Sequence, residues 1–437
     1  MKKLTLFILF IIILFSCKQE TQDPTVFYMP GEFEAHEAVW FGTWYMDEWA
    51  NDYKRVMSEV MKAIDANVQI KMASPSDSIM LIAQKQLDSL GLDTSKIQFF
   101  VMPGEQHWIR DHGAAFVVNH QGELGAVDFE WNGYGSLDWR VLRDSTILDS
   151  LEIFREKTRT GNRAKVDSLM AVATDAKWIK GNLTIEGGSI EVNGKGVLIQ
   201  CEAVTLQRNP GWTKEELEEE FKRTLGVKKV IWLPQGLAED EHIGYFQLGK
   251  YAGVGTGGHT DEFVRFADAQ TILLAWVDES EVDKHPFNKI NFERMLRNYE
   301  ILKKEKDQDG KPFKIIKIPL PYHQERMIVV SDTLNDDIHY QLKSFSYEDQ
   351  KQLSIGDTLT YVAAASYMNF LVTNGVVVTS SYAKDEASIK REKEVEALFK
   401  QAFPDRKIVF VDAMPLNWHG GGIHCSTQQE PKRRVLK

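Results

Sequence analysis

The stretch 366–380 reads SYMNFLVTNGVVVTS, in which two apolar runs flank Asn374-Gly375. Asn-Gly favours the left-handed backbone of a two-residue hairpin turn, and β-branched residues favour strands. We therefore predict an antiparallel hairpin over 370–380. The polar segment SYMN (366–369) would lie at the start of its first strand.

The same plan recurs three more times, each with a polar cluster, an apolar run, a tight turn and a second apolar run. The stretches are RDHGAAFVVNHQGELGAVDF (110–129), EGGSIEVNGKGVLIQ (186–200) and HTDEFVRFADAQTILLAW (259–276). Repeated αβ units around a shared axis would bring the polar clusters to one end of the fold. The pattern alone equally allows a generic open α/β sheet whose polar clusters are merely loops.

Helical patterns lie between the hairpins. In the clearest, 213–225, Thr213 and Glu216 have the spacing of a capping box, and Gly226 follows as a C-cap. The next residues, VKKVIWLP (227–234), predict a strand. The charged stretches 138–180 and 281–360 show helical periodicity and interrupt the repeat, so we interpret them as helical insertions or crossovers within one domain.

Composition limits the classes of partner. The chain has 437 residues, 43% of them hydrophobic, and 52 Lys and Arg against 63 Asp and Glu give a net charge of −11. Such a chain forms a core, and its charge disfavours nucleic acid or a broad anionic membrane as a partner, whereas cationic substrates are compatible. The three cysteines are too few and too scattered for a disulfide scaffold or a thiolate zinc ribbon.

The N-terminus resembles an export signal. Lys2 and Lys3 precede an apolar run over 4–15, and the run ends at Ser16-Cys17, which resembles a bacterial lipobox. We expect 1–16 to be a lipoprotein signal peptide, Cys17 to carry the lipid, 17–26 to be a polar tether and 27–437 to be the functional domain. The protein would then be exported to the cell envelope, with a lipid as its only membrane contact. An ordinary cleaved signal with an incidental cysteine is the alternative.

The polar clusters contain the residue types of a nucleophilic site for a cationic carbon. These are Trp108, Asp111, Glu186, His259, Asp261, Asn369 and Cys425. Cys425 follows three glycines (420–422), which let a backbone approach a ligand closely. By contrast, Cys201 lies in the apolar run VLIQCEAV (197–204) and is interpreted as a core residue.

These polar residues also allow structural or metal-binding interpretations. Asp111 is next to Arg110 and would pair with it at a surface, and Glu186 would cap a turn or else orient an imidazole. His259 and Asp261 lie two residues apart before a strand and would bind a metal together with His419 or His424. The chain has no HExxH or paired CxxC spacing to support that metal site, so we expect none.

The combination of motifs resembles the agmatine deiminase and bacterial peptidyl-arginine deiminase family of guanidine-modifying enzymes. The matching stretches are MPGEFEAHEAVW (29–40), WIRDHG (108–113), IEGGSIEVNGKG (185–196), QRNPGWTKEELEEEF (207–221), GHTDEFVRF (258–266), SYMNFLVTNGVVV (366–378) and GGGIHCSTQQEP (420–431). The resemblance implies a five-bladed pseudo-symmetric α/β propeller, the pentein fold. It also implies hydrolysis of a guanidinium to a ureido product and ammonia through a covalent cysteine adduct, without a cofactor.

Carried over position by position, the resemblance assigns three catalytic roles: Cys425 is the nucleophile, His259 the general acid and base, and Glu186 the support of that histidine. It assigns Asp111 and Asp261 as the carboxylates that hold the guanidinium. Trp108 would form an aromatic wall and Asn369 would lie near the site. Asn374 lies in the hairpin turn, where a structural role is expected.

The resemblance leaves the substrate open between agmatine and a peptidyl-arginine. Peptidyl-arginine enzymes of this family carry arginines shortly after the strand that follows the site aspartate, whereas 128–135 here reads DFEWNGYG and Glu130 has the opposite charge. That difference favours the agmatine type, although Arg140 remains a substitute and the export signal favours peptides. Glu262, where agmatine deiminases commonly have Asn, also bears on the substrate range. A non-catalytic binding lipoprotein and a zinc hydrolase using His259, Asp261 and His424 are the alternative functions.

Overall fold

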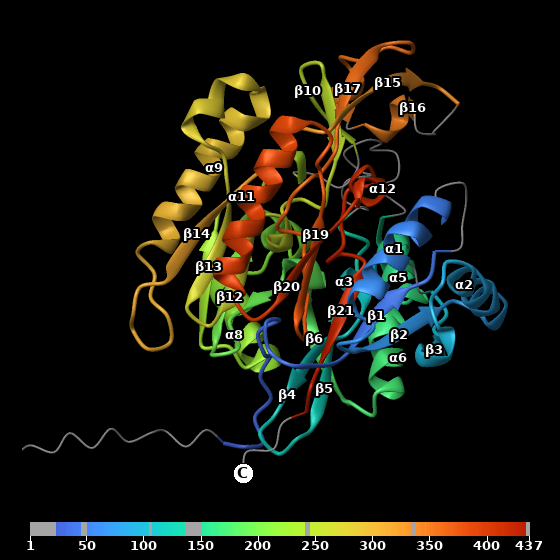
Figure 1. Cartoon of the computed structure of the whole chain (residues 1–437), viewed down its shortest axis with the longest axis vertical. Coiled ribbons are helices and arrows are strands. Elements are labelled where there is room, and N and C mark those ends of the chain that lie inside the picture. Colours follow the sequence, from blue (N-terminus) through green and yellow to red (C-terminus); the bar gives the residue numbers. More distant parts are fainter. Residues whose placement is uncertain are drawn as a thin grey trace, which may run out of the picture.

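The computed structural model describes residues 23–44, 50–104, 107–135, 151–240, 245–333, 338–345 and 347–433. In this part of the chain, strands form six separate sheets rather than one open sheet, and helices pack around them (Figure 1). The interpretation as one generic open α/β sheet is therefore wrong, and the fold is mixed α/β.

Four of the sheets repeat one three-stranded plan. In each, an antiparallel hairpin is followed by a third strand that pairs in parallel with the second. The sheets are β4 (Ala115–Val118), β5 (Leu124–Glu130) and β6 (Lys177–Thr184); β7 (Glu191–Val192), β8 (Val197–Cys201) and β9 (Lys229–Leu233); β12 (Val264–Asp268), β13 (Thr271–Trp276) and β14 (Lys314–Pro319); and β18 (Leu371–Thr373), β19 (Val376–Ser380) and β20 (Lys407–Val411). All four predicted hairpins are confirmed. Gly194 and Gly375 have φ of 66° and 71°, as the predicted turns require.

A fifth sheet has the same plan, but its first strand comes from the other end of the sequence. β21 (Thr427–Pro431) pairs antiparallel with β1 (His36–Gly42), which pairs in parallel with β2 (Gln69–Ser74). A fourth strand, β3 (Gln98–Val101), pairs in parallel with β2. The segment that precedes β21 is therefore brought to the same place in this sheet as the polar clusters in the other four.

A helical connection joins the second and third strands of every unit. Its main helices are α1 (Ala50–Ile64), α6 (Val166–Ala173), α8 (Lys214–Leu225), α9 (Pro286–Leu302) and α11 (Glu386–Ala402). The other helices described are α2 (Asp77–Ser89), α3 (Ile109–His112), α5 (Leu151–Arg159), α7 (Glu202–Arg208), α10 (Tyr347–Gln350) and α12 (Met414–Asn417). The capping box of Thr213 and Glu216 and the left-handed Gly226 C-cap form as predicted.

The expectation of helical insertions at 138–180 and 281–360 is wrong in part. The described residues of the first stretch form α5, α6 and the start of β6, and the second supplies both α9 and β14, so both contain a regular third strand. Lys314 and Lys317 on β14 obscured that strand in the sequence, because both are exposed and lie three residues apart, while Ile316 and Ile318 are buried. Lys317 Nζ lies 3.4 Å from the centre of the Trp276 ring.

The rest of the second stretch adds strands rather than helices. β15 (Glu325–Ser331), β16 (His339–Gln341) and β17 (Thr358–Val362) join β10 (Tyr245–Leu248) and β11 (Tyr251–Val254) in the five-stranded sheet at the top of Figure 1. The core of this sheet also packs against Trp418, a few residues before Cys425. It therefore supports the segment that carries the candidate nucleophile.

The polar segments before the first strands are joined by hydrogen bonds in chain order. Gly188 N–H donates to Asp111 Oδ1 (3.2 Å), and Thr260 Oγ1 donates to the Gly188 carbonyl (3.1 Å). Further links run from Ser366 Oγ to the Glu262 carbonyl (2.7 Å), from His424 N–H to Asn369 Oδ1 (2.9 Å) and from Arg110 N–H to the Cys425 carbonyl (3.2 Å). The last link returns to the first segment, so the five polar segments meet at one place.

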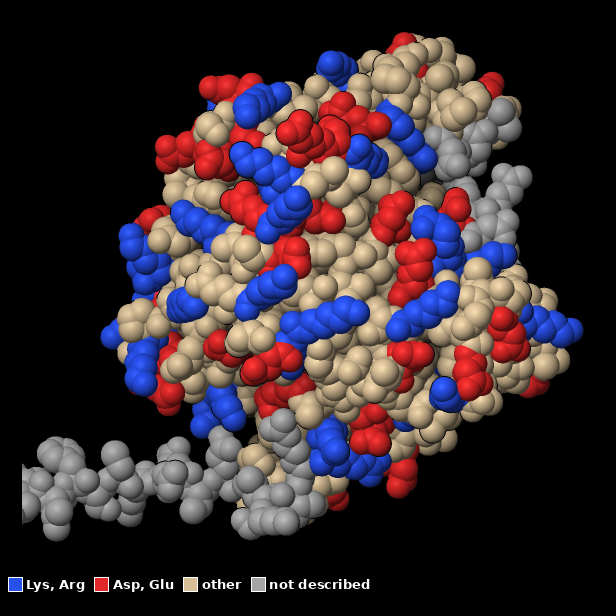
Figure 2. Space-filling view, viewed as in Figure 1, with Lys and Arg blue, Asp and Glu red and all other residues tan. Residues whose placement is uncertain are grey.

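Charge is spread over the outside of the molecule. On the face shown in Figure 2, acidic and basic side chains are interspersed, and many acids lie beside a lysine or arginine. In the part of the chain that the structure describes, no helix is both long and apolar enough to cross a bilayer.

Candidate active site

Cys425 is buried where the five polar segments meet. Its Sγ lies 3.1 Å from Asn369 Nδ2, which donates to it, and 3.5 Å from Asp261 Oδ2. Gly421 leaves room beside it, because a Cβ there would lie 2.6 Å from the indole of Trp108 and 3.3 Å from Cys425 Cβ. The sulfur therefore faces a carboxylate and lies beside an aromatic wall.

Asp111, Asp261 and His259 surround one point beside the sulfur. A Cβ placed on Gly188 would lie 2.5 Å from His259 Nδ1 and 3.0 Å from both Asp111 Oδ1 and Asp261 Oδ2. Within the described part of the chain, His259 Nδ1 and Asp261 Oδ1 are buried without a hydrogen-bond partner. Buried polar atoms rarely lack partners, and a carboxylate oxygen only accepts, so Asp261 Oδ1 indicates a ligand with N–H groups.

His259 is held by a second carboxylate and by the backbone. Its Nε2 lies 3.3 Å from Glu186 Oε2, and Arg208 Nε donates to the other oxygen of Glu186 at 2.9 Å. On the opposite side of the ring, Nδ1 lies 3.7 Å from Asp111 Oδ1. The imidazole thus lies between two carboxylates, and Arg208 fixes one of them.

The surrounding charges shift the pKa of each reactive group. Burial and the nearby carboxylates of Asp261 and Asp111 raise the pKa of Cys425 well above its usual value. Although burial alone would lower it, the carboxylates of Asp111 and Glu186 raise the pKa of His259 to about 9. Burial raises the pKa of Asp111 to about 6. At neutral pH Cys425 is therefore a thiol and His259 an imidazolium.

This assignment predicts slow alkylation of Cys425 in the substrate-free protein. Because only the thiolate reacts, the rate of modification by iodoacetamide should keep rising as the pH passes 9, the ordinary pKa of a cysteine. The rate is measured by mass spectrometry of the Cys425 peptide at a series of pH values. A rate that reaches its plateau below neutral pH would contradict the raised pKa.

Arg110 and Asn374 have structural roles. Arg110 does not pair with Asp111: its Nη1 lies 2.6 Å from Glu32 Oε1, and both side chains are buried. The interpretation of Asp111 as one half of a surface ion pair is therefore wrong. Asn374 bonds both the N–H and the carbonyl of His36 at 2.9 Å, which joins the hairpin turn to β1.

Three residues that shape the site were not found from the sequence. Tyr134 donates its hydroxyl to Asp111 Oδ2 at 2.8 Å and has φ of 61° between two left-handed glycines. Asp240 accepts from the N–H of His259 at 3.0 Å, and Glu32 contacts His424. The sequence signal for Tyr134 was the Gly133-Tyr134-Gly135 triplet, because a large residue at positive φ is often retained for function.

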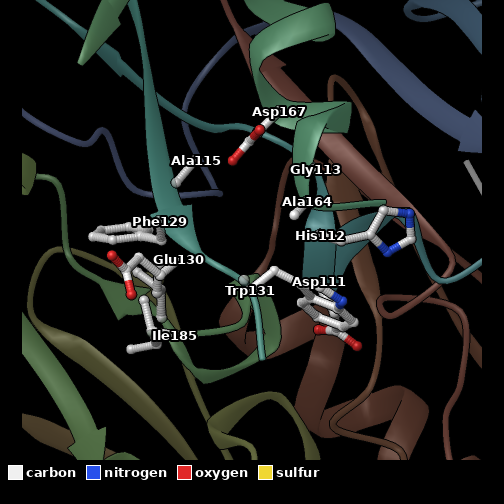
Figure 3. Close-up of a pocket in the computed structure, with 12 residues that line it drawn as sticks. Asp111, His112, Gly113, Ala115, Phe129, Glu130, Trp131, Ala164, Asp167 and Ile185 are labelled. Atoms are coloured by element: carbon white, nitrogen blue, oxygen red, sulfur yellow. The ribbon is translucent and has the colours of Figure 1, made fainter. Parts of the chain in front are cut away.

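Glu130 lies apart from the nucleophile. It lines a cavity of about 10 Å³ that also borders Asp111, and in Figure 3 the two carboxylates lie on opposite sides of it. The cavity has room for about one water molecule. Cys201 is buried in a hydrophobic cluster as expected, where burial raises its pKa to about 11.

The residues near enough to share a metal ion are not the set considered from the sequence, His259 and Asp261 with His419 or His424. Among the described residues, the side chains close enough to share an ion are Asp261, Glu262 and Cys425, whose ligand atoms lie within 4.8 Å of one another. His424 instead has one ring nitrogen on Asp261 and the other on Glu32. Glu262 also accepts from Asn369 Nδ2 at 2.8 Å. Cys17 and Arg140 lie outside the described residues.

Comparison with known proteins identifies the family. The sequence model of the Porphyromonas-type peptidyl-arginine deiminase family matches residues 28–431. The chain belongs to this family. Agmatine deiminase of Ectopseudomonas mendocina is 28% identical over 413 residues, which cover 93% of this chain and 95% of that protein. Agmatine deiminase of Pseudomonas fluorescens is 27% identical over 414 residues, which cover 93% and 95%.

Solved structures support the same membership. Agmatine deiminase of Enterococcus faecalis matches with a TM-score of 0.70 and 26% identity over 93% of this chain and 96% of that one. The resemblance found in the sequence is thus confirmed, and the chain is a guanidine-modifying hydrolase with the mixed α/β fold of these deiminases. The two alternatives, a non-catalytic binding lipoprotein and a zinc hydrolase, gain no support from these relatives.

Proposed function

We propose that the chain hydrolyses the guanidinium of agmatine to a ureido product and ammonia, with Cys425 as nucleophile. The observation that carries the proposal is the arrangement beside the sulfur, where the buried carboxylates of Asp111 and Asp261 and the buried imidazole of His259 surround one point. A planar cation with several N–H groups matches the carboxylates. At 4 Å and an effective dielectric near 20, each carboxylate contributes about 4 kcal/mol of Coulomb attraction before desolvation.

The entering cation also activates the nucleophile. The same carboxylates that keep Cys425 protonated in the empty site are neutralised by the guanidinium, so the pKa of the thiol falls and its proton leaves to solvent. The thiolate then attacks the central guanidinium carbon and forms a C–S bond. Reaction therefore starts only when the substrate is in place.

His259 moves the remaining protons. As an imidazolium it gives a proton to the departing nitrogen, so ammonia leaves when the C–N bond breaks and an amidino thioether of Cys425 remains. The neutral imidazole then takes a proton from water, the water oxygen bonds to the same carbon, and the C–S bond breaks to release the ureido product. Glu186 holds the ring for both steps, while Asn369 and Trp108 keep the sulfur in place.

Agmatine is preferred over an arginine peptide because of the segment 130–135, at the end of β5 and just after it. It carries Glu130 and Tyr134 and includes no arginine to bind a carboxylate. A substrate that ends in an amine suits this acidic and aromatic segment. The second candidate, peptidyl-arginine, is favoured by the export signal of the sequence.

The test compares agmatine, free arginine and an arginine peptide under one set of conditions, with assays for ammonia and for the ureido product. We expect agmatine to be the fastest by kcat/KM. Faster turnover of the peptide would overturn the choice of agmatine, and no ammonia from any of the three would overturn deimination itself.

Tyr134→Phe should change how kcat/KM falls at acid pH. The Tyr134 hydroxyl stabilises ionised Asp111, so its loss should raise the pKa of Asp111 above about 6 and leave less carboxylate to bind the cation. The acid limb of kcat/KM should shift to higher pH, with a loss of roughly three- to tenfold at pH 6. Tyr340→Phe is the control, because that hydroxyl accepts from Arg326 in the five-stranded sheet. An unshifted limb in Tyr134→Phe would contradict this role.

We also propose that Cys17 carries a lipid after removal of 1–16, that 17–26 tethers the domain of 27–437, and that the protein is held at the cell envelope. The support is the sequence alone, in which a short apolar run ends at Ser16-Cys17. Labelling with radioactive palmitate should be lost in Cys17→Ser. Full labelling of that variant would overturn the anchor.

For the architecture, we propose that the five similar units form a five-bladed pseudo-symmetric propeller around the site. Two observations support it: the shared strand plan, and the five polar segments linked in chain order with the last bonded to the first. An experimental structure with the units in any other order around the axis would overturn it.

A further inference from the structure

His424, the residue before the candidate nucleophile, has a carboxylate at each ring nitrogen. Its Nδ1 lies 2.7 Å from Asp261 Oδ2, and its Nε2 lies 2.8 Å from Glu32 Oε2. The ring is 1% exposed. Charge-assisted contacts on both nitrogens fix the position and the orientation of the imidazole. His424 is thus a rigid link between Asp261 and Glu32.

Glu32 is itself held by two buried arginines. Arg110 Nη1 lies 2.6 Å from Glu32 Oε1, and Arg265 pairs with the other oxygen. Arg265 also bonds Glu191 Oε2 through Nε at 2.8 Å, and none of these side chains is more than 9% exposed. The positive charges balance Glu32, so a carboxylate can remain ionised in the interior and serve as a fixed point.

The other end of this chain of contacts is Asp261, whose Oδ2 is held by His424. The same oxygen lies 3.5 Å from Cys425 Sγ and would lie 3.0 Å from a Cβ on Gly188, the point that it shares with His259 and Asp111. Oδ1 is buried and has no hydrogen-bond partner within the described part of the chain. A carboxylate turns about a single bond, so the contact with His424 sets the direction of both oxygens.

We propose that Glu32 and His424 form a relay that positions Asp261 for the guanidinium, with His424 as a positioning residue rather than a catalytic one. This inference rests on the proposed function, because it assigns the carboxylate of Asp261 to the substrate. A histidine that served only to fill space would affect stability, and it would not matter which of its two nitrogens was replaced.

The test separates the two nitrogens. In His424→Asn the amide nitrogen replaces Nδ1 and keeps the bond to Asp261, whereas in His424→Gln it reaches the position of Nε2 and keeps only the bond to Glu32. For agmatine, we expect kcat/KM to fall at most about tenfold in the Asn variant. In the Gln variant we expect a fall of about 100-fold, mostly through KM, because a misplaced binding group can cost that much.

Two further measurements separate positioning from folding. Thermal midpoints of the two variants should be similar, because each loses one buried contact of the same kind. The dissociation constant of agmatine, measured in each variant combined with Cys425→Ala, should show the same order without chemistry. His36→Asn is the control: His36 is also a buried histidine, but its Nδ1 contacts Thr373 at 3.0 Å away from the site, and its loss should leave kcat/KM unchanged.

Equal losses in the two His424 variants, or losses that follow only their thermal midpoints, would overturn the relay while the wild-type protein still deiminates agmatine. An unaffected Gln variant would overturn it as well. A wild-type protein that releases no ammonia from any guanidine would instead overturn the proposed function, and the relay as a substrate-positioning device with it.

Discussion

Cys425→Ala should abolish ammonia release while the fold stays intact. The substitution removes the only atom in the site that can form the covalent adduct, and the residual rate would have to come from water attacking a bound guanidinium directly. Loss of a nucleophile in enzymes that form covalent intermediates costs about 10⁴-fold or more in kcat. The variant should still bind agmatine, because Asp111 and Asp261 remain in place.

The matched control for this variant is Cys201→Ala. Cys201 is also fully buried, but it packs in a hydrophobic cluster. Its truncation should lower the thermal midpoint slightly and leave kcat within a few-fold of wild type, as for other small core deletions. Appreciable turnover in Cys425→Ala with a normal midpoint would refute the nucleophile and the covalent route with it.

The local elements could be predicted because their signals are short in sequence. The Asn193-Gly194 and Asn374-Gly375 turns require left-handed backbone only at the glycine, and the capping box at Thr213 requires four residues. The strand β14 was missed because exposed Lys314 and Lys317 lie three residues apart, a spacing typical of a helix rather than of the alternation of a strand.

The site could be predicted only in part, for a different reason. The polar clusters before each hairpin named the residues that meet at Cys425, but the contacts that orient them span the whole chain. Glu32 and His424 are 392 residues apart, and Tyr134 reaches Asp111 from the turn after β5. The protonation state of Cys425 could not be predicted either, because it depends on how many buried carboxylates surround the sulfur.

The charges of this chain act inside the molecule rather than at its surface. A net charge of −11 excluded polyanionic partners, yet acids and bases are interspersed on the face of Figure 2. The acids that matter for function are the buried ones around Cys425, where a low dielectric strengthens each interaction. The site is therefore selective for a cation without the surface being strongly acidic.

Removal of His259 should have the second largest effect, because both proton transfers of the proposed reaction use it. We expect His259→Gln to lower kcat by about 10²–10⁴-fold, the usual contribution of a general acid and base. The wild-type profile gives a second test. Since the pKa of His259 is raised to about 9, the imidazolium that delivers the first proton is present below that pH, and kcat/KM should fall as the pH rises through 9.

Glu186→Gln tests whether the titration of His259 causes this fall in kcat/KM, the alkaline limb of the pH profile. Glu186 is one of the carboxylates that raise the pKa of His259, so its neutralisation should lower this pKa and move the limb to lower pH. The control is His285→Asn, which removes another carboxylate-bound histidine, 2.9 Å from Glu325, while Asn keeps the N-cap of α9. The limb should not move in this control. A limb that stays at pH 9 in Glu186→Gln would assign it to a group other than His259, because every carboxylate removed from around an imidazolium must lower its pKa.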